Sequence, residues 1–143
     1  MSLIKQSLLI CFGFLTTHVY AANDIIISLK NVKSSSTGVS CTYYWEIKNN
    51  TSVNFTDFAY DFILKDGSGN IVDKTLFRTR LAPNSSVVAD RLLECGGAKQ
   101  IQYVGINNTT KVNGDYLSGL PDKNQILSIP VKIGSESALK VVK

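Results

Sequence analysis

The chain has 143 residues, of which 44% are hydrophobic, and a formal net charge of +4 at pH 7. This length fits one domain of ordinary size, with enough apolar residues for a single packed core. The basic residues are dispersed lysines and three arginines without a run of like charge. Nucleic-acid binding needs a basic stripe with interleaved aromatic residues, so nucleic acid is not an expected partner.

The first 21 residues are predicted to be a secretory signal peptide. Lys5 precedes an apolar run, Leu8 to Leu15, that is too short to span a bilayer. Val19-Tyr20-Ala21 has the small-x-small form of a signal-peptidase site. We therefore expect a periplasmic or secreted protein without membrane insertion, in which residues 22–143 form one domain. The competing interpretation is a buried N-terminal helix.

Removal of the signal peptide changes which residues are left for chemistry. It takes away Cys11 and His18, the only histidine, and leaves Cys41 and Cys95. An even cysteine count in an exported chain indicates a disulfide, with two buried thiols as the alternative. Ser-His-Asp and Cys-His catalysis and histidine-based zinc sites are excluded from a mature chain without histidine.

In chain order, the first predicted strand is Asp24 to Lys33, followed by a polar turn. The second strand, Val39 to Lys48, alternates with period two, which places Val39, Cys41, Tyr43, Trp45 and Ile47 on one face. Further strands are predicted at Phe55–Lys65, Ile71–Leu81, Val87–Cys95, Gln100–Asn107 and Gln125–Ile133. Five aromatic residues on the inward faces are expected to form the core: Tyr43, Trp45, Phe58, Tyr60 and Phe62.

The later strands have weaker patterns. Val87–Cys95 and Gln100–Asn107 carry apolar residues on both faces, so their inward faces are not assigned. Pro130 lacks a backbone donor, which places the last predicted strand at a sheet edge or a bulge. Within the polar segment between residues 107 and 122, Tyr116, Leu117 and Leu120 are expected to pack onto the core. Residues 134–143 are expected to fray.

About seven short strands with turns between them, and no convincing helical period, indicate an all-β protein. The economical arrangement is an immunoglobulin or fibronectin-III-like β-sandwich of two packed antiparallel sheets. No internal repeat or interdomain linker is present in the sequence.

Catalysis and metal binding have weak support in the sequence. Asp57 and Asp61 share a strand face roughly 13 Å apart, which is wide even for an inverting glycosidase. A charged outer sheet face explains them better, although a carboxylate-based glycosidase is one of the hypotheses. The segment Asp66 to Asn70 faintly resembles a calcium loop but lacks its regular acidic spacing, so a hairpin turn is expected. We expect no enzyme activity, cofactor or metal.

A protein-binding surface is a better-supported candidate. Arg78 and Arg80 share a strand face, and arginine is favoured at interfaces because its planar fork pairs carboxylates. Tyr44 faces outward beside Glu46, and Asp57 and Asp61 face solvent or a partner. Surface charges that shield a strand edge are the alternative explanation. The candidate binding residues are Tyr44, Asp57, Asp61, Arg78 and Arg80.

Several stretches resemble known domains. Trp45 in the second strand and the turn L-A-P-N-S-S at Leu81 to Ser86 resemble the fibronectin type III arrangement. The cysteine spacing departs from the immunoglobulin pattern, because Cys41 and Trp45 lie on one strand. More closely, the mature chain resembles the interleukin receptor mimics, a family of small secreted enterobacterial proteins. The resemblance runs through C-T-Y-Y-W-E-I-K-N-N (Cys41 to Asn50), F-A-Y-D-F-I-L-K-D-G-S-G-N (Phe58 to Asn70) and L-A-P-N-S-S-V-V-A-D-R-L-L-E-C-G-G (Leu81 to Gly97).

This resemblance implies a fibronectin-III-like sandwich that forms a domain-swapped homodimer. It also implies release from the cell and binding of host interleukins in the manner of their receptors, as an immunomodulatory virulence factor. Strand exchange between identical chains is physically reasonable, because it preserves the ladder hydrogen bonds. The alternative function is a periplasmic or surface accessory sandwich that binds bacterial envelope partners, for example by strand addition at an open sheet edge.

Overall fold

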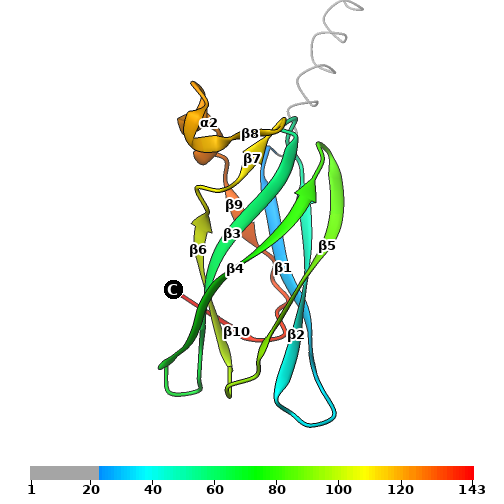
Figure 1. Cartoon of the computed structure of the whole chain (residues 1–143), viewed down its shortest axis with the longest axis vertical. Coiled ribbons are helices and arrows are strands. Elements are labelled where there is room, and N and C mark those ends of the chain that lie inside the picture. The colour runs from blue at the N-terminus through cyan, green and yellow to red at the C-terminus, as the bar shows by residue number, and fades with distance from the viewer. Residues whose placement is uncertain (1–22) are drawn as a thin grey trace, which may run out of the picture.

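A computed structural model of the chain describes residues 23–143, so the predicted signal peptide and its cleavage site lie outside the described residues. The described part holds ten strands, one 3-10 helix and one short α-helix. The strands form two sheets packed face to face (Figure 1). The all-β sandwich expected from the sequence is confirmed.

One layer, called sheet A, has four strands in the order β5-β2-β1-β9. Its strands are β5 (Ser85–Glu94), β2 (Ser40–Asn49), β1 (Ile25–Ser34) and β9 (Val131–Ile133). β2 pairs antiparallel with β1 on one side and β5 on the other. It is buried on every second residue from Cys41 to Asn49, as its sequence alternation predicts. Val39 lies before the strand and is exposed, so its expected place on the inward face was wrong.

The other layer, called sheet B, has six strands built around β3 (Phe55–Lys65). β4 (Ile71–Leu81) pairs with one side of β3, and β6 (Gln100–Ile106) and β7 (Lys111–Val112) share the other side. β10 (Lys140–Val142) extends the sheet beyond β6, and β8 (Asp115–Tyr116) extends it beyond β7. All six strands therefore connect through β3.

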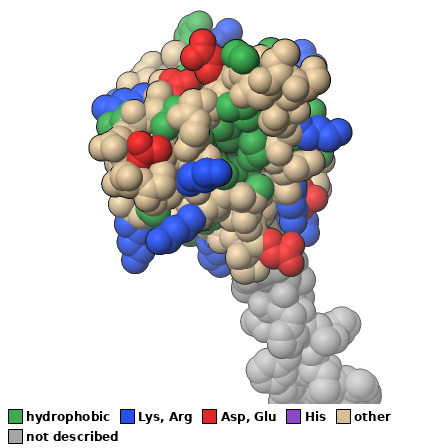
Figure 2. Space-filling view, turned by 90° about the horizontal axis from the view of Figure 1, so that it is seen from below, with side chains coloured by type: hydrophobic (Ala, Val, Ile, Leu, Met, Phe, Trp, Pro, Cys, Tyr) green, Lys and Arg blue, Asp and Glu red, His purple; other side chains and the backbone are tan. Residues whose placement is uncertain are grey.

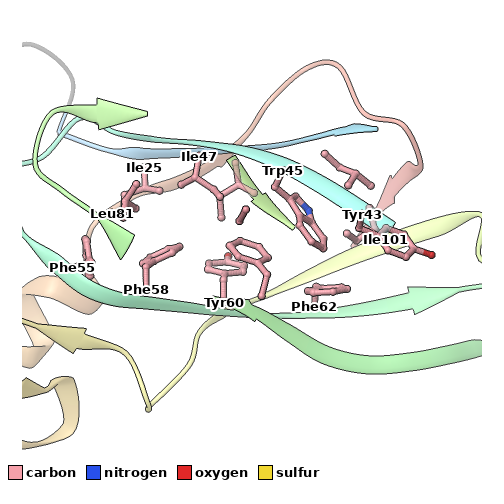
Figure 3. Packing of buried hydrophobic residues seen from close by; sticks show 14 of the residues in the cluster. Ile25, Tyr43, Trp45, Ile47, Phe55, Phe58, Tyr60, Phe62, Leu81 and Ile101 are labelled. Atoms are coloured by element: carbon pink, nitrogen blue, oxygen red, sulfur yellow. The ribbon is translucent and has the colours of Figure 1, made fainter. Parts of the chain in front are cut away.

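The core lies between the two layers and is rich in aromatic rings. Figure 3 shows Tyr43 and Trp45 from β2 facing Phe58, Tyr60 and Phe62 from β3. All five expected core residues are buried. The Trp45 ring lies 4.9 Å from the Phe62 ring and 4.7 Å from the Phe77 ring, measured between centroids. Aromatic contacts at these distances add stability beyond the area that they bury.

A disulfide joins Cys41 in β2 to Cys95, which directly follows β5. The bond therefore links neighbouring strands of sheet A rather than crossing between the sheets. The turn that follows needs glycine at position 96, where φ is +55° and a Cβ would lie 2.5 Å from a methyl group of Val72. A disulfide fits a destination outside the reducing cytosol.

Three expectations about the C-terminal third were wrong. The stretch predicted as a strand from Gln125 begins inside a short helix, α2 (Lys123–Leu127), and only Val131–Ile133 is extended. Residues 140–142 do not fray, because β10 pairs with β6. The sheets are mixed rather than antiparallel, since β9 runs parallel to β1 and β10 runs parallel to β6.

The expected placements around these elements had mixed outcomes. β9 is an edge strand of sheet A, and Pro130, at its start, accepts a backbone hydrogen bond from Ile25, as an edge position allows. Leu117, in the 3-10 helix η1 (Leu117–Gly119), is buried, and Leu120 is half-buried against the core. Tyr116 is exposed instead, with the Lys111 ammonium 4.7 Å from the centre of its ring. A cation over an aromatic face is a favourable contact at the surface and replaces burial here.

A candidate interaction face on sheet B

The outer surface of sheet B, here called the B face, carries the side chains of β3, β4, β6 and β7 that point away from the core. The strand register brings them into rows. Asp57 of β3 pairs with Lys111 of β7. On the other side of β3, Ala59 pairs with Arg78 of β4, and Asp61 pairs with Leu76 of β4. Two side chains from the loop between β6 and β7, Asn107 and Thr109, also belong to the B face. Its members are Asp57, Asp61, Ile63, Leu76, Arg78, Arg80, Val104, Asn107, Thr109 and Lys111.

Four of the five candidate binding residues from the sequence share this face: Asp57, Asp61, Arg78 and Arg80. Tyr44 does not, because it belongs to β2 in the other sheet, where it pairs with Asn31 and Asp90 and is half-buried. The structure therefore divides the candidates between opposite sides of the sandwich. Period two placed each residue on the correct side of its own strand, but pairing of the strands decides which residues meet.

A chain of polar contacts crosses the B face. Arg78 donates one hydrogen bond to Asp57 at 2.8 Å and a second to the hydroxyl of Thr109. Thr109 in turn donates to the Asn107 side-chain oxygen at 2.6 Å, and the Asn107 amide donates to both carboxylate oxygens of Asp61, at 2.9 and 3.1 Å. The two aspartates are thus the ends of one hydrogen-bonded chain rather than a pair of free carboxylates.

The loop that carries Asn107 and Thr109 is held firmly against β3. Thr110 is fully buried, and its hydroxyl bonds both to the Ala59 amide and to the Ala59 carbonyl oxygen, each at 3.1 Å. The backbone N–H of Asn107 also donates to the Ala59 carbonyl oxygen, at 2.8 Å. These hydrogen bonds to the backbone of β3 fix the loop, so the polar side chains that it presents have defined positions.

One half of the B face is a groove with a surplus of positive charge. Its volume is about 480 Å³, and its lining includes Asp57, Arg78, Arg80 and Lys111. The Arg78 and Asp57 side chains keep 41% and 33% of their surface exposed and neutralise each other. Among residues 23–143 the ion pairs are Arg78 with Asp57 and Lys132 with Asp24, so Arg80 and Lys111 have no carboxylate partner there.

The other half of the B face is apolar. Ile63, Leu76 and Val104 line a shallow hollow of about 480 Å³ with Asp61 and Lys74 at its rim. Val104 is 58% exposed because the pairing of β3 with β6 shifts register between Asp61 and Phe62, which leaves Val104 out of the ladder. The bulge therefore turns the Val104 side chain out toward the hollow.

Sequence reasoning missed part of this face. Lys111 lies in the polar segment for which the sequence predicts no strand. Val104 lies in the predicted strand Gln100–Asn107, whose inward face the sequence does not assign. The available signal was the apolar residue on the wrong face of Gln100–Asn107, which indicates a bulge once the strand is known to pair with β3. Asn107 and Thr109 had no such signal, because their roles depend on contacts with β3 and β4.

Two further surfaces carry exposed hydrophobic side chains. At the end that carries the β1–β2, β3–β4 and β5–β6 loops, hydrophobic side chains gather at the centre with lysine and arginine around them (Figure 2). A hollow lined partly by Asp66, Asp73 and Glu94 also involves these loops and is acidic. On sheet A, Val88 and Leu92 of the edge strand β5 are 68% and 67% exposed. Neither surface includes the four clustered candidates.

Within residues 23–143, no group of three or more His, Cys, Asp or Glu side chains is placed to hold a metal ion. In the same residues, no helix has the length and apolar character needed to cross a membrane. A surface with paired charges, a cationic groove and an adjoining apolar hollow has the chemistry of a protein-binding face.

Comparison with known proteins finds likeness at the level of structure. IrmA from Escherichia coli matches 84% of this chain and 98% of its own chain with a TM-score of 0.52, at 16% sequence identity. No family model matches the chain, and no curated protein shows significant sequence similarity to it. At this identity the likeness to IrmA establishes a shared fold.

Proposed function

We propose that this protein is a secreted bacterial binding protein that engages host interleukins by mimicking their receptors. The observation that carries the proposal is the IrmA-like fold. The name IrmA agrees with the interleukin receptor mimics that the sequence resembles. The Cys41–Cys95 disulfide is consistent with export, and the exposed B face supplies a contact surface.

The proposed activity is binding without catalysis. Both carboxylates that the sequence offered for glycoside hydrolysis have partners on the B face, since Asp57 pairs with Arg78 and Asp61 accepts from Asn107. A carboxylate engaged in this way is better suited to shaping a surface than to transferring protons.

The same proposal includes a homodimer formed by strand exchange. β9 and β10 have three residues each, and both are the outermost strands on their side of a sheet. The segment from residue 131 to residue 143 therefore pairs with the rest of the sandwich through short edge strands. The same strand edges in a second copy of the chain offer it equivalent backbone hydrogen bonds. Size-exclusion chromatography with light scattering on the mature chain is expected to give a dimer, and a monomer at all concentrations would contradict this part.

The alternative function is an envelope accessory protein that binds bacterial partners by strand addition. The observation in its favour is the exposed Val88 and Leu92 on β5, which is an edge strand of sheet A. An edge with free backbone groups and apolar side chains is a template for another strand.

One experiment separates the two functions. The folded mature protein is passed over a panel of immobilised interleukins, with reduced and denatured protein as the control. Saturable binding by the folded protein alone supports receptor mimicry. Absence of binding to the whole panel, together with capture of envelope proteins by the same preparation, would favour the accessory function.

A further inference from the structure

We propose that the B face is a docking site for one amphipathic helix of a protein partner, with a carboxylate in the cationic groove and an apolar side chain in the hollow. This inference deepens the proposed function, because it names the surface and the chemistry of the partner segment. It rests on the proposed function only for the identity of the partner, and its physical basis is the B face alone.

The charge distribution in the cationic groove favours binding of a carboxylate. Arg80 is exposed and Lys111 is half-buried, and neither pairs with a carboxylate of residues 23–143. Arg78 is already paired with Asp57. A carboxylate that contacts Arg80 or Lys111 gains charge-assisted hydrogen bonds, and the surplus of positive charge favours its approach.

The same groove disfavours a densely charged polyanion. Asp57 lies among the three cationic side chains and repels a continuous row of sulfate or phosphate groups. The apolar hollow next to the groove makes no favourable contact with such a ligand. A protein surface that carries a few acidic and a few apolar side chains satisfies both halves.

The spacing of the two halves suits a helix. Leu76 and Arg80 stand four residues apart on β4, which corresponds to roughly 13 Å along a strand. A helix covers about the same distance in nine residues, and helices are the usual cover for a sheet face. The partner segment therefore carries apolar residues near one end and acidic residues two to three turns later on the same side.

The polar chain across the face lowers the cost of docking. Arg78 is held from both sides by Asp57 and Thr109, and Asn107 is held by Asp61 and Thr109. Side chains that are already ordered lose little rotamer freedom when a partner arrives. Arg80 and Lys111 then make the new ionic contacts beside a fixed neighbour.

The test uses a synthetic helical peptide and the mature, disulfide-bonded protein labelled with ¹⁵N. The peptide has two leucines in its first turns and two glutamates about nine residues later on the same face, and its matched control has glutamine in place of glutamate. We expect chemical-shift changes at Arg80, Val104 and Lys111 with the acidic peptide, at least several-fold weaker with the glutamine control, and weaker again at high salt.

Four variants locate the site. Arg80→Glu with Lys111→Glu, and Val104→Asp, are expected to abolish the shifts. Lys48→Glu and Val88→Asp on the outer surface of sheet A are the matched charge and apolar controls, and they are expected to leave binding unchanged. Shifts confined to sheet A, or equal binding of both peptides, would overturn the proposed site.

The outcome is separable from that of the interleukin assay. If the protein binds interleukins and the B-face variants bind equally well, the docking site is wrong and the proposed function stands. If no interleukin binds but the acidic peptide shifts the B face, the proposed function fails and the docking site stands. Failure of both measurements would reject both proposals.

Discussion

At the scale of single residues, buried polar groups inside the core set how stability depends on pH. The Tyr103 hydroxyl and the Trp45 indole N–H are both buried and near each other without a hydrogen bond of good geometry. Burial raises the pKa of Tyr103 to about 12. Burial likewise raises the pKa of Tyr43 and of Tyr60. The core therefore tolerates these phenols only in their neutral form.

We predict that the protein loses stability in strong base. An unfolded tyrosine releases its proton near pH 10, whereas Tyr103 does so near pH 12, so the unfolded state gains from ionisation first. The free energy of unfolding is expected to be constant up to about pH 10. Ionisation of Tyr103 in the unfolded state then lowers it by up to about 2 kcal/mol as the pH approaches 12. Urea unfolding followed by Trp45 fluorescence measures this fall. Parallel pH curves for the wild type and Tyr103→Phe would contradict the assignment.

Asn49 is a second residue whose burial has a measurable consequence. It is almost fully buried at the end of β2, where its amide nitrogen donates to the carbonyls of Val53, Leu81 and Ala82. Its side-chain oxygen accepts from the Thr51 amide and hydroxyl. One side chain therefore ties together the β2–β3 and β4–β5 connections.

We expect Asn49→Ala to lower the free energy of unfolding by about 2–3 kcal/mol, because several buried backbone groups lose their partner. Asn31→Ala, at an exposed position of β1, is the matched control and is expected to change stability by less than about 0.5 kcal/mol. Chemical denaturation of both variants gives the comparison. Equal effects would show that the buried clamp contributes nothing specific.

At the scale of elements, the sequence predicted where the six long strands β1 to β6 lie, and period-two alternation assigned the inward faces of β2 and β3 but not those of β5 and β6. The inward residues of β2 and β3 follow directly from it, since a strand with one buried face alternates. The helix α2 escaped prediction because five residues are too few to display a helical period. β10 escaped because its three residues are extended only through pairing with β6, a contact that residue order alone does not reveal.

The disulfide provides the prediction that belongs to this scale. The two cysteines are 54 residues apart in the sequence, and the loop that they close includes all of β3 and β4. In the chain-entropy description, closing a loop of this size stabilises the fold by roughly 3–5 kcal/mol. The double variant Cys41→Ala with Cys95→Ala is expected to unfold at correspondingly lower urea concentration. A free-thiol titration of denatured wild type is expected to detect no thiol from these two residues, and two reactive thiols would contradict the bond.

At the scale of the whole molecule, the candidate site is a property of strand order. Asp57, Asp61, Arg78 and Arg80 could be named from the sequence because each stands on an outward position of its strand. Their meeting with Lys111 and Val104 requires β6 and β7 to share one side of β3, which follows from the complete topology. Tyr44 was equally plausible from its strand, yet the sandwich places it on the opposite side.

Interleukin binding by matched variants is the sharpest test of whether the B face binds a protein partner. Affinity for an immobilised interleukin that the wild type binds is compared among wild type, the Arg80→Glu and Lys111→Glu double variant, and Lys48→Glu. The double variant is expected to lose roughly tenfold or more in affinity, because two charges on the B face are reversed, while Lys48→Glu is expected to bind like the wild type. Unchanged binding by the double variant, or loss of binding by Lys48→Glu alone, would contradict binding of the partner at the B face.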